Sequence, residues 1–369
     1  MTEYFHNVIG DFFSESIDCE GRIAVIGAGL PPELIYCADS APIWILSGSP
    51  ADARGCDTVP KDADDMSRSI IGLLSSGRLN IEKLAAMIVL ISDDNSRKLA
   101  FEMSEHCRVI TVDLPAMYQA SDRDGYWRKS VMRLYDELDS IRSIKRGSIR
   151  GAVDFTNSAR RQISRLVSEA ERHPSVISFS ECLTVVNSLF CSHCKEEWLR
   201  QLTALNDILQ YMKLDEDHPT DPDILLIGSP VYYPNHKLLR LFSETGLRLR
   251  GTLSPVMQLF FDDEMKKRRT DFTQLCTIGE RSIGNIVLSE YLGTDYVSGR
   301  LADELERIRP KGVVFHVIRG RKTEDADSQR FERQCEYRGI SFFKIETDYQ
   351  ENDIEQLRLR LEAFREILV

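Results

Sequence analysis

Short apolar runs rich in β-branched residues alternate along this chain with stretches that carry apolar residues at helical spacing. The runs cover residues 22–26, 42–46, 86–91 and 108–112, and then 223–227, 247–250, 312–318 and 340–345. Helical stretches cover residues 64–74, 95–103 and about 352–368, and another begins near Pro31. Strands that alternate with helices are typical of βα units in a parallel sheet. The pattern therefore predicts an α/β protein.

The middle of the chain, from Gly125 to Met212, has no strand pattern. Ile163, Leu166 and Ala170 recur there at helical spacing, which predicts three or four helices. Residues 215–222 are acidic and contain two prolines, as linkers often do. We therefore expect two Rossmann- or flavodoxin-like parallel-sheet domains joined by a helical segment. The expected boundaries are an N-terminal segment at 1–20, a first α/β domain at 21–120, a helical region at 121–215, and a second α/β domain with inserted helices at 222–369.

Charge and composition exclude several classes of protein. The 369 residues carry a formal net charge of -11, which argues against a nucleic-acid partner because phosphate neutralisation needs a basic face. No run approaches the roughly 18 apolar residues that span a membrane, and Met1 to Asp11 has no secretory pattern. The nine cysteines are odd in number and scattered. We therefore expect a cytoplasmic protein with reduced thiols and no membrane partner.

Two glycine turns follow predicted strands, where ligands bind in open α/β sheets. Gly27-Ala28-Gly29 comes after the first strand, but Pro32 stands where a dinucleotide fingerprint has its third glycine. A plain turn is therefore favoured over nucleotide binding, with Gly27 and Gly29 as candidate pocket residues. Gly228-Ser229-Pro230 follows the strand at 223–227, and its amides suit either an anionic or carbonyl group or a simple turn.

Acidic and thiol pairs give two further hypotheses. Asp93-Asp94 follows the third strand, where carboxylates could do acid–base work or hold a cation, but a helix cap is favoured. Cys191 and Cys194 form the one close cysteine pair, and packed thiols are favoured there over a metal or redox site. His316 lies inside a predicted strand and is interpreted as a core histidine.

The last segment carries a long, specific residue order. Ile345-Glu346-Thr347-Asp348-Tyr349 is followed by Asp353-Ile354-Glu355-Gln356-Leu357-Arg358 and by Arg360-Leu361-Glu362-Ala363-Phe364. This order resembles the terminal signature of the 2-hydroxyacyl-CoA dehydratase and benzoyl-CoA reductase subunit family. Leu30-Pro31-Pro32-Glu33, Gly228-Ser229-Pro230 and residues 312–320 agree in register, so the resemblance covers nearly the whole chain.

The resemblance implies a place in anaerobic acyl-CoA metabolism. Members of this family pair two related subunits and hold a 4Fe–4S cluster, mainly through cysteines at strand ends. The cluster delivers one electron to an acyl-CoA thioester, and a separate ATP-hydrolysing activator supplies that electron. The implied partners are therefore a cluster-bearing homologous subunit, an ATP-dependent activator and an acyl-CoA ligand.

The chain departs from the family at the cluster ligands. The expected cysteines fall at Gly27, at or near Asp64, at Asp93 and at Arg321. Cys56 would take part only if the alignment shifts, and one thiolate cannot hold a cluster. We therefore expect no cofactor and no metal in this chain.

These observations predict a cluster-free subunit that shapes the acyl-CoA pocket beside an iron–sulfur subunit of a dehydratase (a lyase) or reductase. The alternative is a stand-alone, non-redox paralogue, a self-dimer that binds a small ligand or acts as a scaffold. We expect the carboxylates of Asp64 and Asp93 to face Arg321 in a polar or salt-bridged cavity. The candidate pocket residues are Gly27, Gly29, Asp64, Asp93, Asp94, Gly228, Ser229 and Arg321.

Overall fold

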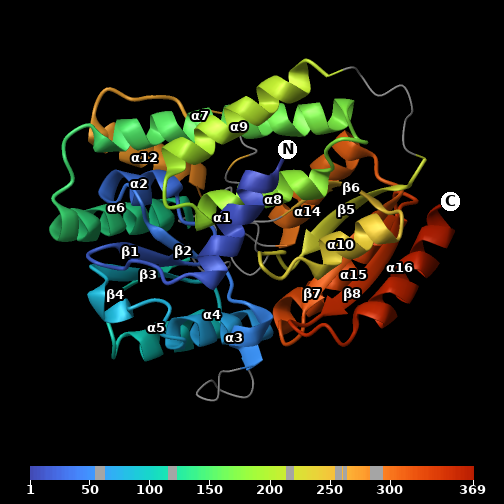
Figure 1. The fold of residues 1–369 in the computed structure, drawn as a ribbon, viewed down its shortest axis with the longest axis horizontal. Coiled ribbons are helices and arrows are strands. Elements are labelled where there is room, and N and C mark those ends of the chain that lie inside the picture. The colour runs from blue at the N-terminus through green and yellow to red at the C-terminus, as the bar shows by residue number, and fades with distance from the viewer. Residues whose placement is uncertain (55–62, 115–122, 213–219, 254–259, 261–263, 283–293) are drawn as a thin grey trace.

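Two four-stranded parallel sheets form the centre of the protein (Figure 1). The structure is a computed structural model, and it describes residues 1–54, 63–114, 123–212, 220–253, 260, 264–282 and 294–369. The strand order is β2-β1-β3-β4 in the first sheet and β6-β5-β7-β8 in the second. Both orders change direction beside the first strand of their sheet, which is the doubly wound arrangement that leaves a crevice at the carboxyl ends of the strands.

The first sheet contains β1 (Ile23–Ile26), β2 (Ile43–Ile45), β3 (Ala86–Ile91) and β4 (Val109–Asp113). Its connections contain helices α2 (Pro32–Ala38), α3 (Pro50–Arg54), α4 (Asp65–Ser75) and α5 (Asp94–Met103), with a short 3-10 turn at Ile81–Lys83. Every residue of β1, β2 and β3 is buried, as is usual for parallel strands that helices cover on both faces.

The second sheet contains β5 (Asp223–Gly228), β6 (Arg248–Thr252), β7 (Gly312–Ile318) and β8 (Ser341–Thr347). The segments between and after its strands contain α10 (Lys237–Glu244), α12 (Asp271–Ser282), α14 (Thr294–Ile308), α15 (Lys322–Glu336) and α16 (Ile354–Leu368). Of these helices, α12 packs chiefly against α6 and α7 of the helical region. All seven residues of β7 are buried, so this strand forms the middle of the second core.

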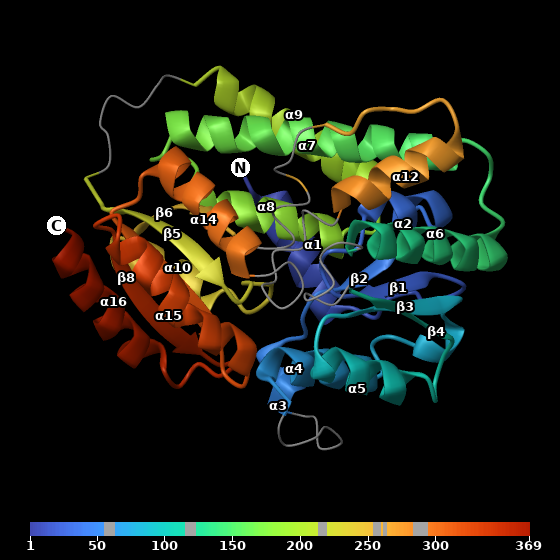
Figure 2. The same ribbon diagram turned by 180° about the vertical axis from the view of Figure 1, so that it is seen from behind.

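Four helices fill the middle of the chain: α6 (Arg123–Arg142), α7 (Ser148–Arg172), α8 (Phe179–Cys191) and α9 (Lys195–Gln210). The long helix α7 runs beside α9 and spans the space above both sheets (Figure 2). The sequence pattern did not predict α1 (Glu3–Ser14), which packs on α8 and places the ring of Phe5 against that of Trp198. In the described part of the chain, no helix has the length and apolar character that crossing a bilayer requires.

The segment after β8 connects the second sheet to the first through hydrogen bonds. The Tyr349 hydroxyl lies 2.7 Å from the Ser47 hydroxyl, and the Tyr349 N–H donates to a carboxylate oxygen of Asp65 at 3.0 Å. Behind this contact, the buried ammonium of Lys237 lies 3.3 Å from Asp348 and 2.7 Å from Asp353. The terminal sequence signature thus holds the two sheets in one arrangement.

The structure confirms the predicted α/β class and shows all eight predicted strands, with ends that differ by at most two residues. Residues 125–212 are helical and contain no strand where the structure describes them, as expected. The short helix α3 was not predicted, because five residues are too few to show a helical period. The predicted domain boundaries stay predictions.

We expect Tyr349→Phe to lower the free energy of unfolding by about 1–2 kcal/mol, because it removes the hydroxyl that meets Ser47 in a buried site. Urea denaturation measures the change. Tyr337→Phe is the matched control. Tyr337 is 91% exposed, so removing its hydroxyl should leave the free energy of unfolding unchanged. Equal stabilities for the two variants would show that the inter-sheet hydrogen bond contributes nothing.

Candidate functional site

A small cavity of about 70 Å³ lies where the carboxyl ends of β1 and β3 approach the second sheet. Its lining includes the apolar side chains Ile26, Leu46, Met66, Ile70, Leu90 and Leu99. It also includes polar residues: Ser67, Ser92, Asp93, Ser96, Tyr232 and Arg321. Because Tyr232 and Arg321 come from the second α/β unit, the cavity lies between the two sheets.

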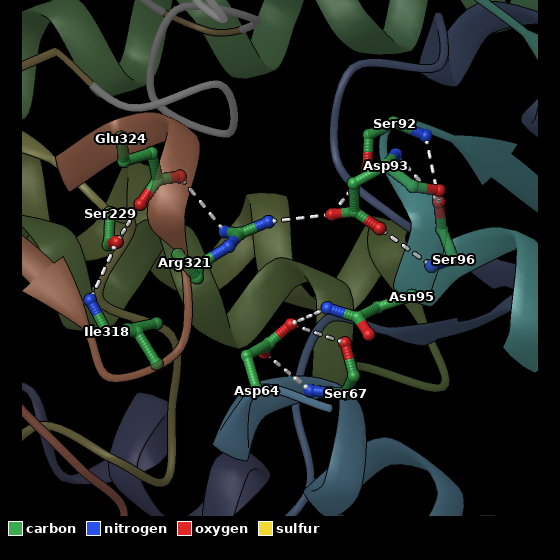
Figure 3. Close-up of polar contacts among 10 residues, drawn as sticks. All are labelled: Asp64, Ser67, Ser92, Asp93, Asn95, Ser96, Ser229, Ile318, Arg321 and Glu324. Carbon is green, nitrogen blue, oxygen red and sulfur yellow. Dashed lines mark hydrogen bonds and ion pairs between the residues drawn. The ribbon is translucent and has the colours of Figure 1, made fainter. Parts of the chain in front are cut away.

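Arg321 crosses from the second sheet to the first (Figure 3). Its Nη2 lies 3.0 Å from Oδ2 of Asp93, and its Nη1 lies 3.2 Å from Oε1 of Glu324. Burial works against the charge of this guanidinium, but the carboxylates of Glu324, Asp64 and Asp93 outweigh it and raise the pKa of Arg321. Arg321 therefore stays charged and joins a carboxylate of each sheet.

Asp93 both caps a helix and holds Arg321. Its Oδ1 accepts from the Ser96 N–H at 2.7 Å at the start of α5, and the Asp93 N–H donates to the Ser96 hydroxyl at 3.0 Å. This reciprocal pair is a capping box, so the predicted helix cap is confirmed. The other carboxylate oxygen of Asp93, Oδ2, forms the ion pair with Arg321. The neighbouring Asp94 side chain is 78% exposed, pairs with Lys98 at 3.2 Å, and does not line the cavity.

Asp64 also caps a helix, at the start of α4. Its carboxylate accepts from the Ser67 N–H and hydroxyl, both at 2.9 Å, and from the Asn95 amide at 2.8 Å. The Asp64 side chain is buried, and its charge helps to raise the pKa of Arg321. The backbones of the two units also approach each other here, because a Cβ added to Gly320 would lie only 3.3 Å from Cα of Asp64. Asp64, Asp93 and Arg321 therefore lie close together. Of the two aspartates, Asp93 forms the direct ion pair with Arg321.

Ser229 supports the network from the second sheet. Its hydroxyl donates to Glu324 and accepts from the Ile318 N–H at 2.9 Å. Burial raises the pKa of Glu324, although Arg321 and the Ser229 hydroxyl act in the opposite direction. Ser229 thus fixes the carboxylate that faces Arg321 and does not itself line the cavity.

Gly228 is required by the turn that presents Ser229. Its φ is +94°, and a Cβ there would lie 2.2 Å from the carbonyl oxygen of His316. The Ser229 N–H already donates to that same oxygen at 2.8 Å, so it is not turned toward a ligand. The turn interpretation of Gly228-Ser229-Pro230 therefore fits the geometry better than an anion site.

His316 is a hydrogen-bonded core residue, as predicted. Its Nδ1 lies 2.8 Å from the Ser229 carbonyl oxygen, and its Nε2 lies 2.7 Å from the Thr347 hydroxyl. Burial lowers the pKa of His316 to about 4, so the imidazole is neutral near pH 7. A neutral ring can accept from Thr347 while it donates to the carbonyl, which fixes the Ser229 turn to β8.

Gly27 contributes backbone to the cavity wall. Its φ is +99°, and a Cβ would lie 3.0 Å from Cβ of Leu90, so a side chain at this position is strained and crowded. Gly29 also has a positive φ, of +113°, but it does not line the cavity. The backbone of both glycines suits a tight turn, which is the interpretation that the sequence favoured, and nucleotide binding stays an untested alternative.

Thiolates do not line the cavity within the described residues. The eight cysteines described are all free, and they are Cys19, Cys37, Cys107, Cys182, Cys191, Cys194, Cys276 and Cys335. Cys191 is buried whereas Cys194 is exposed, and no cluster of three or more possible metal-binding residues occurs in the described segments. Cys56 lies outside the described residues.

Sequence reasoning missed Glu324, Asn95 and Tyr232. Glu324 stands three residues after Arg321 in the first turn of α15, a spacing that places two side chains on one face of a helix. The three-residue spacing from Arg321 was the one feature of the sequence that could have indicated Glu324. Nothing in the sequence relates Asn95 to Asp64 or Tyr232 to Arg321, because those contacts join separate elements.

Comparisons with known proteins agree with this arrangement. The family described as 2-hydroxyglutaryl-CoA dehydratase, D-component, matches residues 28–368. The protein of Escherichia coli (strain K12) named "Putative dehydratase subunit YjiM" is 23% identical over 288 residues, which cover 74% of this chain and 72% of that protein. The match includes every strand except β1, the helices between the two sheets, and every residue of the cavity wall except Ile26 and Gly27.

We expect Arg321→Met to lower the free energy of unfolding by about 3 kcal/mol, because it leaves two part-buried carboxylates without their cation. Arg321→Met combined with Asp93→Asn should recover part of that loss, since Asn can still cap α5. Chemical denaturation gives both values. Arg338→Met, at an exposed position of the same α/β unit, is the control and should change stability by less than about 0.5 kcal/mol. A loss in Arg321→Met no larger than in the control would contradict the proposed bridge.

Glu324 should make stability depend on pH. Its pKa is higher in the folded protein than the ordinary value of 4.5, so the folded state holds its proton more tightly than the unfolded state does. As pH rises above the ordinary value, the wild type should lose stability relative to Glu324→Gln, which carries no titrating group. Denaturation curves between pH 4.5 and neutrality test this. Glu332→Gln, exposed on the same helix, should follow the wild type at every pH.

Proposed function

Because this chain belongs to the 2-hydroxyglutaryl-CoA dehydratase D-component family, we propose that it is the cluster-free subunit of an acyl-CoA dehydratase. In this proposal it forms part of the acyl-CoA pocket, while a related subunit carries the iron–sulfur cluster and receives the electron from an activator. The observation that carries the proposal is the Arg321–Asp93 ion pair, at two of the positions where the family resemblance leads us to expect cysteine ligands.

The residues around the cavity do not fit a 4Fe–4S cluster. Iron–sulfur clusters need several thiolates, and Gly27, Asp93 and Arg321 offer a bare backbone, a carboxylate and a cation. Both carboxylates in this place are also engaged, Asp64 with Ser67 and Asn95, and Asp93 with Ser96 and Arg321. We therefore derive no electron-transfer step through this subunit.

The cavity suits a small neutral group better than a second anion. Three carboxylates, from Asp64, Asp93 and Glu324, surround the single guanidinium of Arg321, so an added carboxylate or phosphate would meet net negative charge. A thioester is uncharged, and the apolar wall formed by Ile70, Leu90 and Leu99 can contact an aliphatic chain.

The size of the cavity points to the acyl end of such a ligand. A single water needs roughly 10–15 Å³ measured in the same way, so about 70 Å³ accommodates a group of a few heavy atoms. The nucleotide of coenzyme A would have to lie outside. The chain's own contribution is therefore to exclude water from the acyl group and to hold Arg321 and Asp93 fixed at one end of it.

We expect the chain purified alone under anaerobic conditions to contain less than about one iron per chain, because the cavity lacks thiolates. Co-expression with a cysteine-rich homologue of the same family should give a stable complex in which the iron and sulfide belong to the homologue. Iron and sulfide analysis with visible absorbance measures this. A cluster bound to this chain alone would refute the proposal, and a chain that never binds the homologue would favour the stand-alone paralogue.

Ala28→Leu should fill part of the cavity from the β1 turn without altering a charge. If the acyl group binds there, the complex should lose at least about tenfold in its rate of acyl-CoA dehydration, equivalent to about 1.4 kcal/mol. The matched control is Ala363→Leu on the exposed side of α16, which should keep the full rate. Unchanged turnover in Ala28→Leu, with assembly intact, would place the acyl group elsewhere.

A further inference from the structure

The free edges of the two sheets differ in how they are protected. An unpaired strand edge attracts other strands, and proteins blunt such edges with charges, prolines, bulges or short length. Of the four edge strands, β2 has three residues, all buried, and β6 carries Arg248 and Arg250 and pairs with β5 through a shifted register. The edge strand β8 has Lys344 at its centre. These three edges are protected against further pairing.

The edge strand β4 has none of these features. Its sequence, Val109-Ile110-Thr111-Val112-Asp113, is uncharged until its last residue, contains no proline, and pairs with β3 in an unbroken register. Thr111 and Asp113 are exposed, and Val109 and Ile110 are half-buried. The strand lies at the periphery of the molecule in both views (Figures 1 and 2). Within the described residues, no strand covers its outer edge.

Exposed aromatic residues lie on the two helices that contact β4. Phe101 on α5 is 72% exposed, and Tyr126 on α6 is 45% exposed. Tyr126 and Arg133 form a shallow groove with residues 110–113 of β4. An exposed strand edge with aromatic side chains beside it is the kind of surface that a second polypeptide covers.

The backbone of β4 offers three outward-facing residues. The Met87 N–H of β3 donates to the carbonyl oxygen of Arg108, so the backbone groups of residues 108, 110 and 112 face β3. Alternate residues of a strand direct their backbone groups to opposite sides. The N–H and C=O groups of Val109, Thr111 and Asp113 therefore face outward.

We propose that a second copy of this chain pairs through β4, antiparallel to the first, with Thr111 on the two-fold axis. Thr111 then faces Thr111 of the second copy, and Val109 faces Asp113 of the second copy. In each of these pairs both residues direct N–H and C=O outward, so each forms the doubly hydrogen-bonded pair of an antiparallel ladder. The two sheets join into one continuous sheet of two-fold symmetry.

The side chains and charges suit this self-pairing. On the α6 side of the strand, Ile110 faces Val112 of the second copy, an apolar β-branched pair, and threonine meets threonine on the axis. Antiparallel pairing also brings the basic amino end of one strand, at Arg108, beside the acidic carboxyl end of the other, at Asp113. No two like charges face one another along the strand. A second copy of the chain is therefore the occupant that this edge fits.

The surface is separate from the candidate pocket. No residue of β4 lines the cavity at Asp93 and Arg321. Self-pairing consequently does not rest on the proposed function, and it leaves the inter-sheet cavity accessible to a ligand or to a different subunit.

Light scattering during size-exclusion chromatography tests the pairing on the full chain. Over a roughly hundredfold concentration range in the micromolar region, we expect a mass that approaches twice the 42.2 kDa of one chain. Thr111→Lys places two like charges on the axis, and Thr111→Pro removes an outward N–H without touching the β3 ladder. Both variants should be monomeric, with circular dichroism spectra like that of the wild type. Ser341→Lys, on the edge strand β8, is the matched control and should remain dimeric.

A cross-link tests the register independently of dissociation. Facing residues of a hydrogen-bonded antiparallel pair have Cα atoms about 5.5 Å apart, within reach of a disulfide. Thr111→Cys should therefore form covalent dimers on mild oxidation, and Ser341→Cys should not. A wild type that stays monomeric throughout, a dimer that survives in both Thr111→Lys and Thr111→Pro, or association only with a different subunit would each overturn the proposal.

Discussion

Arg321 places one positive charge among three carboxylates, and the meeting of the two sheets depends on that charge. Its guanidinium joins Asp93, which starts α5 of the first unit, to Glu324, which starts α15 of the second. Without the cation, the carboxylates of Asp64, Asp93 and Glu324 would repel one another where the carboxyl ends of the strands approach. Buried charge of this kind requires an opposite charge nearby. The contact between the two sheets at Asp93 satisfies that requirement.

The proposed ligand site and a structural bridge coincide here. The same Asp93 carboxylate caps a helix through one oxygen and holds Arg321 through the other. Tyr349, from the terminal signature, adds an uncharged link to Ser47 at the same junction. The C-terminal sequence signature, which first indicates the family, therefore links the two sheets through hydrogen bonds. Its residues are explained by packing and hydrogen bonding, and they do not by themselves report a chemical activity.

The sequence predicted those features that short-range patterns encode. Runs such as Ala86–Ile91 fixed the strands, the Asp93 cap followed from the polar residues at the start of a helix, and Gly228 followed from a turn after a strand. Contacts between distant residues were not predictable in this way. Asp93 meets Arg321 only because the second unit folds onto the first, and Tyr232 lies near Arg321 only because β5 and β7 are neighbours in one sheet. No local spacing in the sequence describes either approach.

The geometry at Gly27 works against a thiolate at this position. With φ at +99° and Leu90 Cβ only 3.0 Å from the place of a Cβ, no cysteine can enter at residue 27 until the turn and its neighbour have moved. A thiol at residue 321 would in turn remove the cation that the surrounding carboxylates require. Cysteines at these two positions would therefore each disturb a different set of contacts, and a thiolate-lined wall here would require several coordinated changes.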